Sequence, residues 1–542
     1  MADLLRLFAV WLPAYRVYAG VATSFLVAMV AGAWMRATLL MVAVALGGCA
    51  ALPGHVERPV SYAQAGDATT PLAHVVAAST LGDAGVVSGF RLLPDGEEAF
   101  QTRLALIRKA ERTLDVQYYQ IANDRTGLEF LGALRDAASR GVRVRVLVDD
   151  LYASGEDSLF AEMGAVPNLK VRMFNPLPVR GDRLDARIVL SLHQFSRINH
   201  RMHNKLFIAD GSLAVIGGRN IADEYFGRGQ HANFIDADAL VCGPVIGRLA
   251  AVFDSFWNSE HAYPIQALAP SAVTSPANAA LDSANTPSSA AQDERAAQAP
   301  ATGVVGELSS GRVEFSFGNA EVLADDPSKI GSDGKAEGPP SIGMRELIEH
   351  AESRAFVSSP YLIPGTSEMA SIAQARHAGV SVQILTNSLQ STDEPLVYVG
   401  FAKHAAALAS LGVDVREVRA EAADADAGHA SLASRLGSSL SRLHAKLVVV
   451  DGRWSSIGSF NLDRRSALWN TEMVVHVDCV ALAQQLEGWA QANVAGLATG
   501  SRRARSDASQ SVQEAARGEL ATPTDARWWQ RAAVALVSED LL

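Results

Sequence analysis

Apolar positions in the first third of the chain follow two alternating spacings. Residues 99–115 and 128–140 place apolar side chains three and four positions apart, which is typical of one face of a helix. Residues 114–119 and 142–148 are short runs rich in Val, Leu and Tyr, which predict strands. Because helices alternate with short β-branched runs, the pattern predicts a layered α/β fold.

The same pattern occurs a second time along the chain. Residues 347–352 echo residues 106–111, and residues 376–387 echo residues 138–149, in each case a helix end or a Gly-Val turn followed by an apolar strand. A repeat of this length indicates duplication of a whole unit rather than a short solenoid repeat. The two predicted halves span residues 89–263 and 312–500.

The N-terminal region, residues 1–53, is almost wholly apolar. Its last part has a charged start at Arg36, an apolar run, and small residues directly before Cys49. This order predicts a signal region with a lipobox, in which Cys49 would be lipidated. An uncleaved membrane anchor is the alternative, and Met35 is an alternative start of the protein. Polar and small residues 54–88 would then form a tether between membrane and domain.

Two further segments fall outside the predicted halves. Residues 264–311 are rich in Ala, Ser, Pro and Asn and predict a low-complexity insertion without a packed core. The tail, residues 501–542, carries Trp528 and Trp529 between arginines and before an apolar run. That composition predicts a helix lying in a membrane interface, and a helix packed on its own domain is the alternative.

Composition narrows the class of protein. The chain has 542 residues, of which 49% are hydrophobic, so two domains are expected rather than one core. Its formal net charge of −11 argues against a nucleic acid partner, which usually requires a basic surface. The three cysteines form no CxxC pair, so neither a zinc site nor a disulfide framework is predicted.

The candidate chemistry lies in a motif that occurs once in each half. Residues 201–211 and 442–452 both read Arg, one residue, His, one residue, Lys, an apolar run and Asp-Gly. In a strand, His203 and Lys205 would share a face, as would His444 and Lys446. Lysine supplies positive charge to phosphoryl oxygens, and histidine can act as nucleophile or as general acid. Two copies therefore predict cleavage of a phosphodiester by two histidines.

Each motif is followed by further matching positions. Asn220 and Asn461 follow a pair of small residues and would donate to a phosphate oxygen. Asp236, preferred over Asp238, and Glu472 would each hold the second nitrogen of a histidine. Asp210 and Asp451, at the end of each motif, are candidate catalytic residues, with a purely structural role in the turn as the alternative. No metal is predicted, because His200 and His203 lack further ligands nearby in sequence, and no cofactor is predicted.

These residues resemble the signature of the phospholipase D superfamily, H-x-K-x4-D with a following G-G/S-x-N. Within the superfamily they are most similar to bacterial cardiolipin synthases of the C type, through residues 110–119, 199–205, 217–226 and 385–389 among others. The resemblance implies one α/β/α sandwich per half and a pseudo-twofold cleft in which the motifs meet. It also implies a metal-free ping-pong reaction, with His203 as the nucleophile that forms a phosphatidyl-histidine and His444 as the acid and base.

The leading functional hypothesis is a phosphatidyl transferase at a bacterial cell-envelope membrane, as a periplasm-facing lipoprotein. It would make cardiolipin from phosphatidylglycerol and a second phospholipid, for which phosphatidylethanolamine is a candidate. A phospholipase D-type hydrolase would use the same intermediate with water as the acceptor. A nuclease and a non-catalytic membrane scaffold are the remaining alternatives. Oligomeric state is not predicted.

Overall fold

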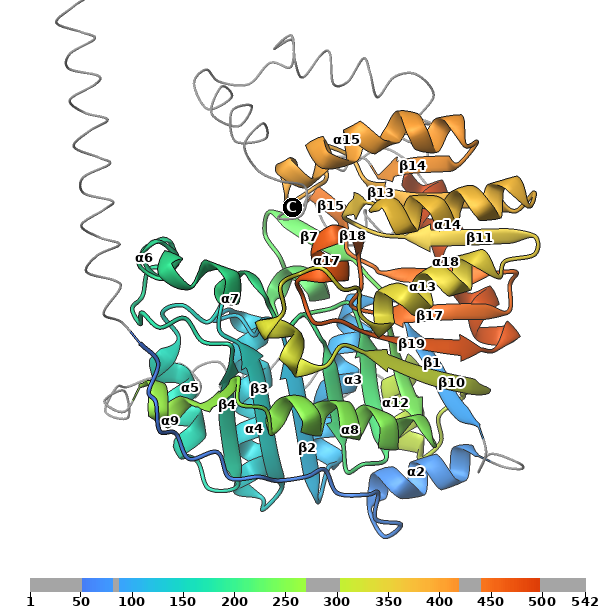
Figure 1. The fold of residues 1–542 in the computed structure, drawn as a ribbon. Helices are drawn as coiled ribbons and strands as arrows, with labels where there is room; N and C mark the ends of the chain where they lie inside the picture. The colour runs from blue at the N-terminus through green and yellow to red at the C-terminus, as the bar shows by residue number, and fades with distance from the viewer. Residues whose placement is uncertain (1–50, 81–86, 270–302, 419–439, 498–542) are drawn as a thin grey trace, which may run out of the picture.

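The computed structural model describes residues 51–80, 87–269, 303–418 and 440–497 (Figure 1). Its centre is one sheet of fifteen strands in the order β14-β13-β11-β16-β17-β19-β10-β1-β8-β6-β5-β2-β3-β4-β9. The strands of the first half are β1 (Ser88–Leu93), β2 (Thr113–Tyr118), β3 (Arg143–Asp149), β4 (Leu169–Phe174), β5 (Leu206–Ala209), β6 (Leu213–Gly217), β8 (Asp238–Cys242) and β9 (Ala262–Pro264). Those of the second half are β10 (Ser316–Ala324), β11 (Arg354–Ser358), β13 (Ser381–Asn387), β14 (Asp414–Val418), β16 (Leu447–Val450), β17 (Trp454–Gly458) and β19 (Met473–Asp478).

The two halves repeat the same strand order outward from a common junction. β1 pairs antiparallel with β10, with Gly89 opposite Phe317. From β1 the order is β8, β6, β5, β2, β3, β4, and from β10 it is β19, β17, β16, β11, β13, β14. The duplication is therefore confirmed as a pseudo-twofold arrangement. The halves share a single sheet, because their first strands pair with each other, and each half contributes its own strands and helices to the predicted α/β layers.

Helices cover both faces of the sheet. Those of the first half and its flanks are α2 (Pro71–Ser79), α3 (Gly96–Lys109), α4 (Arg125–Ser139), α5 (Asp157–Ala165), α6 (Leu184–Leu190), α7 (Phe195–Asn199), α8 (Val245–Trp257), α9 (Ile265–Leu268) and α12 (Gly303–Ser310). Those of the second half are α13 (Pro339–Glu349), α14 (Thr366–His377), α15 (Pro395–Ser410), α17 (Arg464–Leu468) and α18 (Val480–Leu497). The long helices α8 and α18 share one face and one core that spans both halves. The opposite face carries a separate core in each half.

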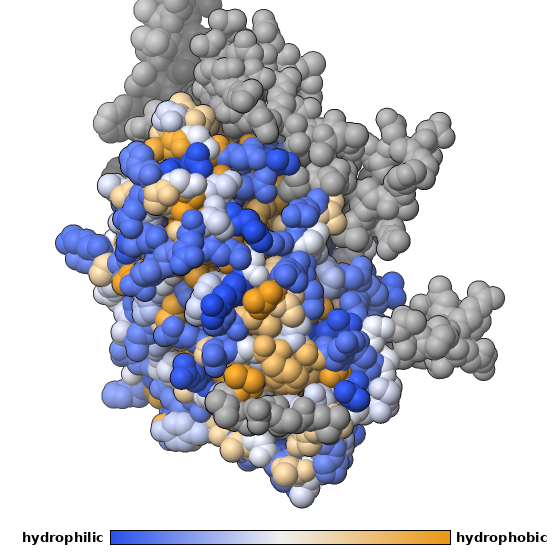
Figure 2. All heavy atoms as spheres, turned by 90° about the vertical axis from the view of Figure 1, so that its right-hand side faces the viewer, coloured by the Kyte–Doolittle hydropathy of each residue, from blue (hydrophilic) through white to orange (hydrophobic). Residues whose placement is uncertain are grey.

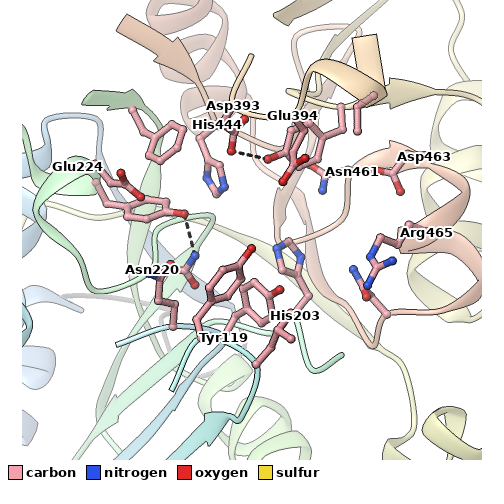
Figure 3. Close-up of a pocket in the computed structure, with 18 of the residues that line it drawn as sticks. Tyr119, His203, Asn220, Glu224, Asp393, Glu394, His444, Asn461, Asp463 and Arg465 are labelled. Carbon is pink, nitrogen blue, oxygen red and sulfur yellow. Dashed lines mark hydrogen bonds between the residues drawn. The ribbon is translucent and has the colours of Figure 1, made fainter. Parts of the chain in front are cut away.

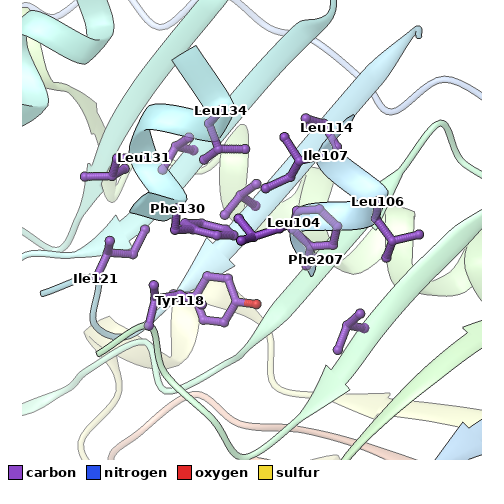
Figure 4. Packing of buried hydrophobic residues seen from close by; sticks show 14 of the residues in the cluster. Leu104, Leu106, Ile107, Leu114, Tyr118, Ile121, Phe130, Leu131, Leu134 and Phe207 are labelled. Carbon is purple, nitrogen blue, oxygen red and sulfur yellow. The ribbon is translucent and has the colours of Figure 1, made fainter. Parts of the chain in front are cut away.

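Local sequence explains where the first elements begin and end. Helix α3 starts because the Asp95 side chain accepts a hydrogen bond from the backbone N–H of Glu98, and its apolar face buries Phe100 and Leu104. It ends at Lys109, earlier than the predicted residues 99–115, because the next residues turn into β2. In the core of the first half, Leu104 lies among Phe130, Tyr118 and the strand residue Phe207 (Figure 4).

The described part of the predicted tether, residues 54–80 and 87–88, is not free of the folded domain, which corrects the expectation from its composition. The Arg58 side chain donates to the carbonyl oxygen of Ala262 at 3.2 Å, and the Ala63 N–H donates to the Asp254 carboxylate at 2.9 Å. Helix α2 buries Leu72 and Val75 in the core of the first half. The segment is thus bound along the first half by hydrogen bonds and by its apolar face.

Other predicted segments meet the structure only in part. Within the predicted insertion 264–311, helix α12 is folded and buries Val304 and Leu308 in the core of the first half. Cys49 and the tail at 501–542 lie outside the described residues. None of the helices in the described ranges combines the length and the apolar character needed to cross a bilayer.

Candidate active site

The H-x-K segments lie just before strands, not within them as expected from their apolar pattern. Strand β5 begins at Leu206 and β16 at Leu447. The backbone ahead of each strand pairs with the other half instead. The N–H of His203 donates to the carbonyl of Thr471 at 2.9 Å, and the N–H of His444 donates to that of Ile235 at 2.8 Å.

Two short ladders make this contact between the halves. Strand β15 (Leu440–Leu443) pairs in parallel with β7 (Ala232–Ile235), and Met202 forms the equivalent bridge to Thr471. Each ladder ends directly before a histidine on one side and a carboxylate on the other. The pairing therefore brings the histidine of one half against the acid of the other.

The histidine–carboxylate pairs are accordingly crossed between the halves. Nδ1 of His203 lies 2.9 Å from Oε2 of Glu472, and Nδ1 of His444 lies 2.7 Å from Oδ2 of Asp236. All four side chains are buried. A carboxylate at Nδ1 fixes the tautomer with a proton on Nδ1 and leaves the Nε2 lone pair available.

The small residues after each motif make room for these acids. A Cβ atom on Gly218 would lie 2.6 Å from the Asp236 carboxylate, so only glycine fits there. At the equivalent place in the second half, the Ser459 hydroxyl donates to Glu472. Asp238, the alternative to Asp236, is instead paired with Arg103 at 2.7 Å.

Both lysines are buried beside their histidines. Nζ of Lys205 donates to the carbonyl of His203 at 2.6 Å, and Nζ of Lys446 donates to the carbonyl of His444 at 2.5 Å. The Lys205 ammonium also lies 5.3 Å from the centre of the Tyr119 ring. Two ammonium groups held in one buried site create a strong positive potential suited to an anionic phosphodiester.

Burial and the neighbouring cations set the protonation of the four basic groups. Burial lowers the pKa of His203 to about 4, although Glu472 works in the opposite direction. Burial and then Lys446 and Lys205 hold the pKa of His444 well below its usual value. Burial also lowers the pKa of Lys446 to about 8 and that of Lys205 well below its usual value. At neutral pH both imidazoles are therefore neutral, which is the form a nucleophile needs.

These pKa values predict a plateau in the pH dependence of kcat/KM. Activity is expected to fall below about pH 4, where His203 gains a proton, and at alkaline pH, where Lys205 and Lys446 lose theirs. A short-chain soluble phosphodiester assayed from acid to alkaline pH measures both limits. In an enzyme that carries both Lys205→Arg and Lys446→Arg the alkaline limit is expected to move up, because the guanidinium groups stay charged. An unmoved limit in that variant would assign the alkaline step to another group.

Both histidines open into one cavity of about 480 Å³ (Figure 3). Asn220 and Asn461 line it, and the side-chain oxygen of each is buried without a hydrogen-bond partner among the described residues. Nδ2 of Asn220 donates to the Tyr225 hydroxyl at 2.9 Å. The structure thus brings together eight predicted residues: His203, Lys205, Asn220, Asp236, His444, Lys446, Asn461 and Glu472.

The cavity wall breaks the pseudo-twofold symmetry. Aligning the two motifs makes Arg465 the counterpart of Glu224, and Tyr152 and Asp393 lie in the loops that follow the equivalent strands β3 and β13. All four line the cavity, and Figure 3 shows Glu224 and Arg465 on opposite sides of it. Asp393 accepts a hydrogen bond from the Tyr361 hydroxyl at 2.7 Å. One part of the wall is therefore acidic and the opposite part carries a guanidinium.

Sequence reasoning missed this wall, since its residues differ between the repeats. It also missed Asp149 and Asn387, which end equivalent strands and hold the segment before each motif. Asp149 accepts from the N–H of Met202 at 2.8 Å, and Asn387 accepts from the N–H of Leu443 at 2.9 Å. Their place at matching strand ends was the available signal.

Asp210 and Asp451 do not reach the cavity. The Asp210 carboxylate accepts hydrogen bonds from the N–H groups of Arg112 and Thr113, at 2.8 and 2.9 Å. Asp451 does the same for Ser353 and Arg354. Both aspartates have positive φ, 50° and 53°, in the turn after the strand. The geometry fits the structural alternative, in which each aspartate fixes two turns, and gives no direct contact with the reacting groups.

An Asp210→Ala protein is expected to lose about 2–3 kcal/mol of unfolding free energy, because backbone N–H groups lose a charged acceptor. The carboxylate is buried, whereas that of Asp451 is more exposed, so Asp451→Ala should cost less. Urea unfolding measures both. Turnover of the folded Asp210→Ala enzyme is expected to stay within about threefold of the original, which is a change of under 1 kcal/mol. A fall of several orders of magnitude in folded enzyme would restore a catalytic role.

His200 lies outside this arrangement. Its Nδ1 contacts the carbonyl of Ser196 at 2.7 Å, and its ring packs on Trp469. Within the described ranges no three His, Cys, Asp or Glu side chains are grouped as metal ligands. The basic groups of the site are instead two lysines and two histidines.

Comparison of the sequence with known proteins identifies related chains. A family model described as "Cardiolipin synthase, PLD-like domain" matches residues 104–257 and 344–493. The chain is 34% identical over 396 residues to cardiolipin synthase C of Escherichia coli K12, covering 72% of this chain and 81% of that protein. It is 26% identical over 401 residues to a cardiolipin synthase of Staphylococcus aureus, covering 73% and 65%.

A solved structure shares the fold. The phosphatidylserine synthase of Haemophilus influenzae aligns with a TM-score of 0.52 at 14% identity, covering 85% of this chain and 98% of that one. The alignment includes nearly all of the solved chain, so its architecture extends over both halves described above.

Proposed function

The chain belongs to the cardiolipin synthase family of phospholipase D-like enzymes, and from this premise we propose that it transfers a phosphatidyl group to phosphatidylglycerol and so makes cardiolipin. The observation that carries the proposal is the pair of crossed histidine–carboxylate contacts beside two buried lysines. This set of groups supplies a nucleophile, an acid and anion binding in one cavity.

In the first step, the donor phosphate lies between the Lys205 and Lys446 ammonium groups. Nε2 of His203 attacks phosphorus, and the bond to the headgroup oxygen breaks. His444 donates the proton that this oxygen needs. The bound phosphate anion offsets the lysine charges that hold down the pKa of His444, so binding of substrate itself favours the protonated acid.

In the second step, a hydroxyl of phosphatidylglycerol replaces the departed headgroup. His444, now neutral, takes the proton from that hydroxyl, and the oxygen attacks phosphorus while the bond to His203 breaks. Asp236 and Glu472 orient the two rings and stabilise each imidazolium as it forms. Between the steps the protein holds only the phosphatidyl group on His203, because the proton has left with the headgroup alcohol and His444 is neutral.

Hydrolysis is the alternative outcome of the same intermediate. Water in place of the lipid hydroxyl would release phosphatidic acid, and the catalytic groups would be the same. The names of the related synthases favour transfer. A membrane location in the bacterial cell envelope, with a lipid-modified Cys49, is part of the proposal and rests on the sequence alone.

Labelled phosphatidylglycerol in mixed vesicles, with and without phosphatidylethanolamine, tests the proposal. The purified full chain is expected to form labelled cardiolipin, and its yield with the second lipid identifies the donor. Phosphatidic acid as the sole product would establish a hydrolase instead. Cleavage of DNA without any lipid product would exclude both lipid reactions.

The acidic part of the wall predicts a preference among headgroups. Burial and then the nearby Asp393 raise the pKa of Glu224, so the acids here are closely coupled. Replacing both by Glu224→Gln and Asp393→Asn is expected to lower kcat/KM for a lipid with an ammonium headgroup by roughly tenfold, or about 1.4 kcal/mol. Competition with a lipid that carries a glycerol headgroup measures the change. Equal losses for the two headgroups would show that the acids do not select between them.

A further inference from the structure

The second half carries an open apolar groove far along the strands from the catalytic cavity. It has a volume of about 850 Å³ and lies between α13 and the neighbouring strands β10, β17 and β19. Ile342 and Trp454 line it and are 39% and 40% exposed, which is unusual for large apolar side chains in this chain. Figure 2 views the molecule from the side at one end of these strands, and apolar residues occur there among hydrophilic ones.

The equivalent surface of the first half is covered. Strand registers make Leu213 the counterpart of Trp454, since each pairs with the matching residue of the next strand, Cys242 or Asp478. Leu213 is fully buried. It lies in one core with Leu72 of α2 and Leu308 of α12.

Two helices provide this cover, and both come from outside the repeated unit. Helix α12 lies on α3, and the N–H of Val304 donates to Glu98 of α3 at 2.9 Å. Helix α2 packs on α3 and β6. The groove therefore corresponds to a surface of the first half that is covered there by α2 and α12.

His476 lines the groove at a position where the first half has an apolar residue. Its counterpart by register is Leu240, which is fully buried. The Nε2 atom of His476 is buried and has no hydrogen-bond partner among the described residues. Burial lowers the pKa of this ring to about 4, so at neutral pH the ring is neutral and its Nε2 atom lacks a hydrogen-bond partner among the described residues in either tautomer.

The order of segments in the duplication indicates what covers the groove. In the first half α8 ends at Trp257, and the chain then crosses to the other face and begins α12 at Gly303. In the second half the equivalent helix α18 ends at Leu497, and the apolar run starts 31 residues later at Trp528, compared with 46 residues from Trp257 to Gly303. An extended chain spans about 3.3 Å per residue, so this shorter connection is also long enough to pass from one face to the other.

The chemistry of the tail matches the groove. Trp529, Ala533 and Leu536 have the spacing of one helix face. A tryptophan N–H is a donor only, so it can pair with Nε2 of His476 in the tautomer that carries its proton on Nδ1. Three exposed carboxylates line the groove beside Arg453, and the tail sequence carries Arg527 and Arg531; the carboxylates are Glu321, Glu346 and Glu352.

We propose that the tail segment 527–537 docks into the groove between α13 and β10, β17 and β19, and covers the second half as α12 covers the first. The docked segment buries Trp454 and Ile342, and a tail tryptophan donates to Nε2 of His476. The tail is then a part of the folded enzyme and not a membrane-bound helix.

Disulfide trapping in the full chain tests this docking. Cysteines are placed as Ile342→Cys in the groove and Val534→Cys in the tail, with Lys170→Cys, exposed on β4, in place of the groove cysteine as the matched control. Mild oxidation is expected to give an intramolecular disulfide between 342 and 534, at least tenfold above the 170–534 product. Mass mapping of peptides separates these products from any formed by Cys49.

A third variant tests the specific contact. Trp454→Glu in the Ile342→Cys, Val534→Cys background is expected to reduce trapping at least fivefold, with unchanged turnover. Equal trapping at 342 and 170 would overturn the proposal, as would intermolecular disulfides, which would assign the groove to a second copy. Loss of the 342–534 product on addition of phospholipid vesicles would assign the tail to the membrane.

Discussion

The His203→Ala enzyme is expected to turn over on the order of 10⁶-fold more slowly than the original, because the substitution removes the proposed nucleophile. His444→Ala is expected to cost about 10²–10⁴-fold, the usual contribution of a positioned acid and base. The two losses should not add in the double variant, since both residues serve one sequence of steps. Turnover of a short-chain phosphodiester measures each of them.

The leaving group separates the two roles. A p-nitrophenyl ester needs no proton to depart, so it is expected to restore the first step in His444→Ala but not in His203→Ala. The His444→Ala enzyme should then accumulate a covalent phosphoryl group on His203, since the acceptor lacks its base. Mass spectrometry of the quenched enzyme locates this group. Its appearance on His444 in the His203→Ala enzyme would reverse the assignment. His350→Ala, on the exposed end of α13, is the matched control.

Asp236→Asn is expected to reduce turnover by about 10⁴-fold, because an amide can hold the wrong tautomer of the ring it contacts. The consequence should appear at His444, in the other half of the sequence repeat, since these side chains lie 2.7 Å apart. Glu472→Gln should act on His203 in the same way. Each variant is therefore expected to show the defect of the histidine that its acid contacts, which belongs to the other half.

The p-nitrophenyl substrate makes this crossing measurable. Asp236→Asn should be rescued in the first step, as His444→Ala is, whereas Glu472→Gln should resemble His203→Ala and resist rescue. Thermal unfolding of both proteins checks that substitution in the buried pairs has not unfolded them. If rescue instead appeared in Glu472→Gln, each acid would serve the histidine of its own half, against the contacts described here.

Much of the site was readable from sequence because its residues recur. The two H-x-K segments, Asn220 and Asn461 stand at matching places after matching strands, and a repeat is visible without any coordinates. The partner of each acid was not readable. Spacing along the chain ranks Asp236 near His203, but the parallel pairing of β15 with β7 places it at His444.

Where the repeats diverge, sequence carried little information. Glu224 and Asp393 have no matching acid in the other half, so nothing distinguished them from solvated loop residues. The polar composition of 54–88 predicted a tether, but composition does not register specific contacts such as Ala63 N–H with Asp254. The shared sheet depends on antiparallel pairing of β1 with β10, which no local pattern specifies.

The crossed contacts limit how this chain can be recombined with its relatives. A chimera that takes one half from another synthase exchanges a histidine and, with it, the acid that orients the other histidine. Each half thus contributes one member of each histidine–carboxylate pair. The two parent sequences must therefore be compatible at the short backbone pairings before His203 and His444. A crossover chosen in the linker between the halves keeps each sandwich whole but mixes both pairs, so functional chimeras should depend on matching the segments around Thr471 and Ile235 rather than on the position of the cut.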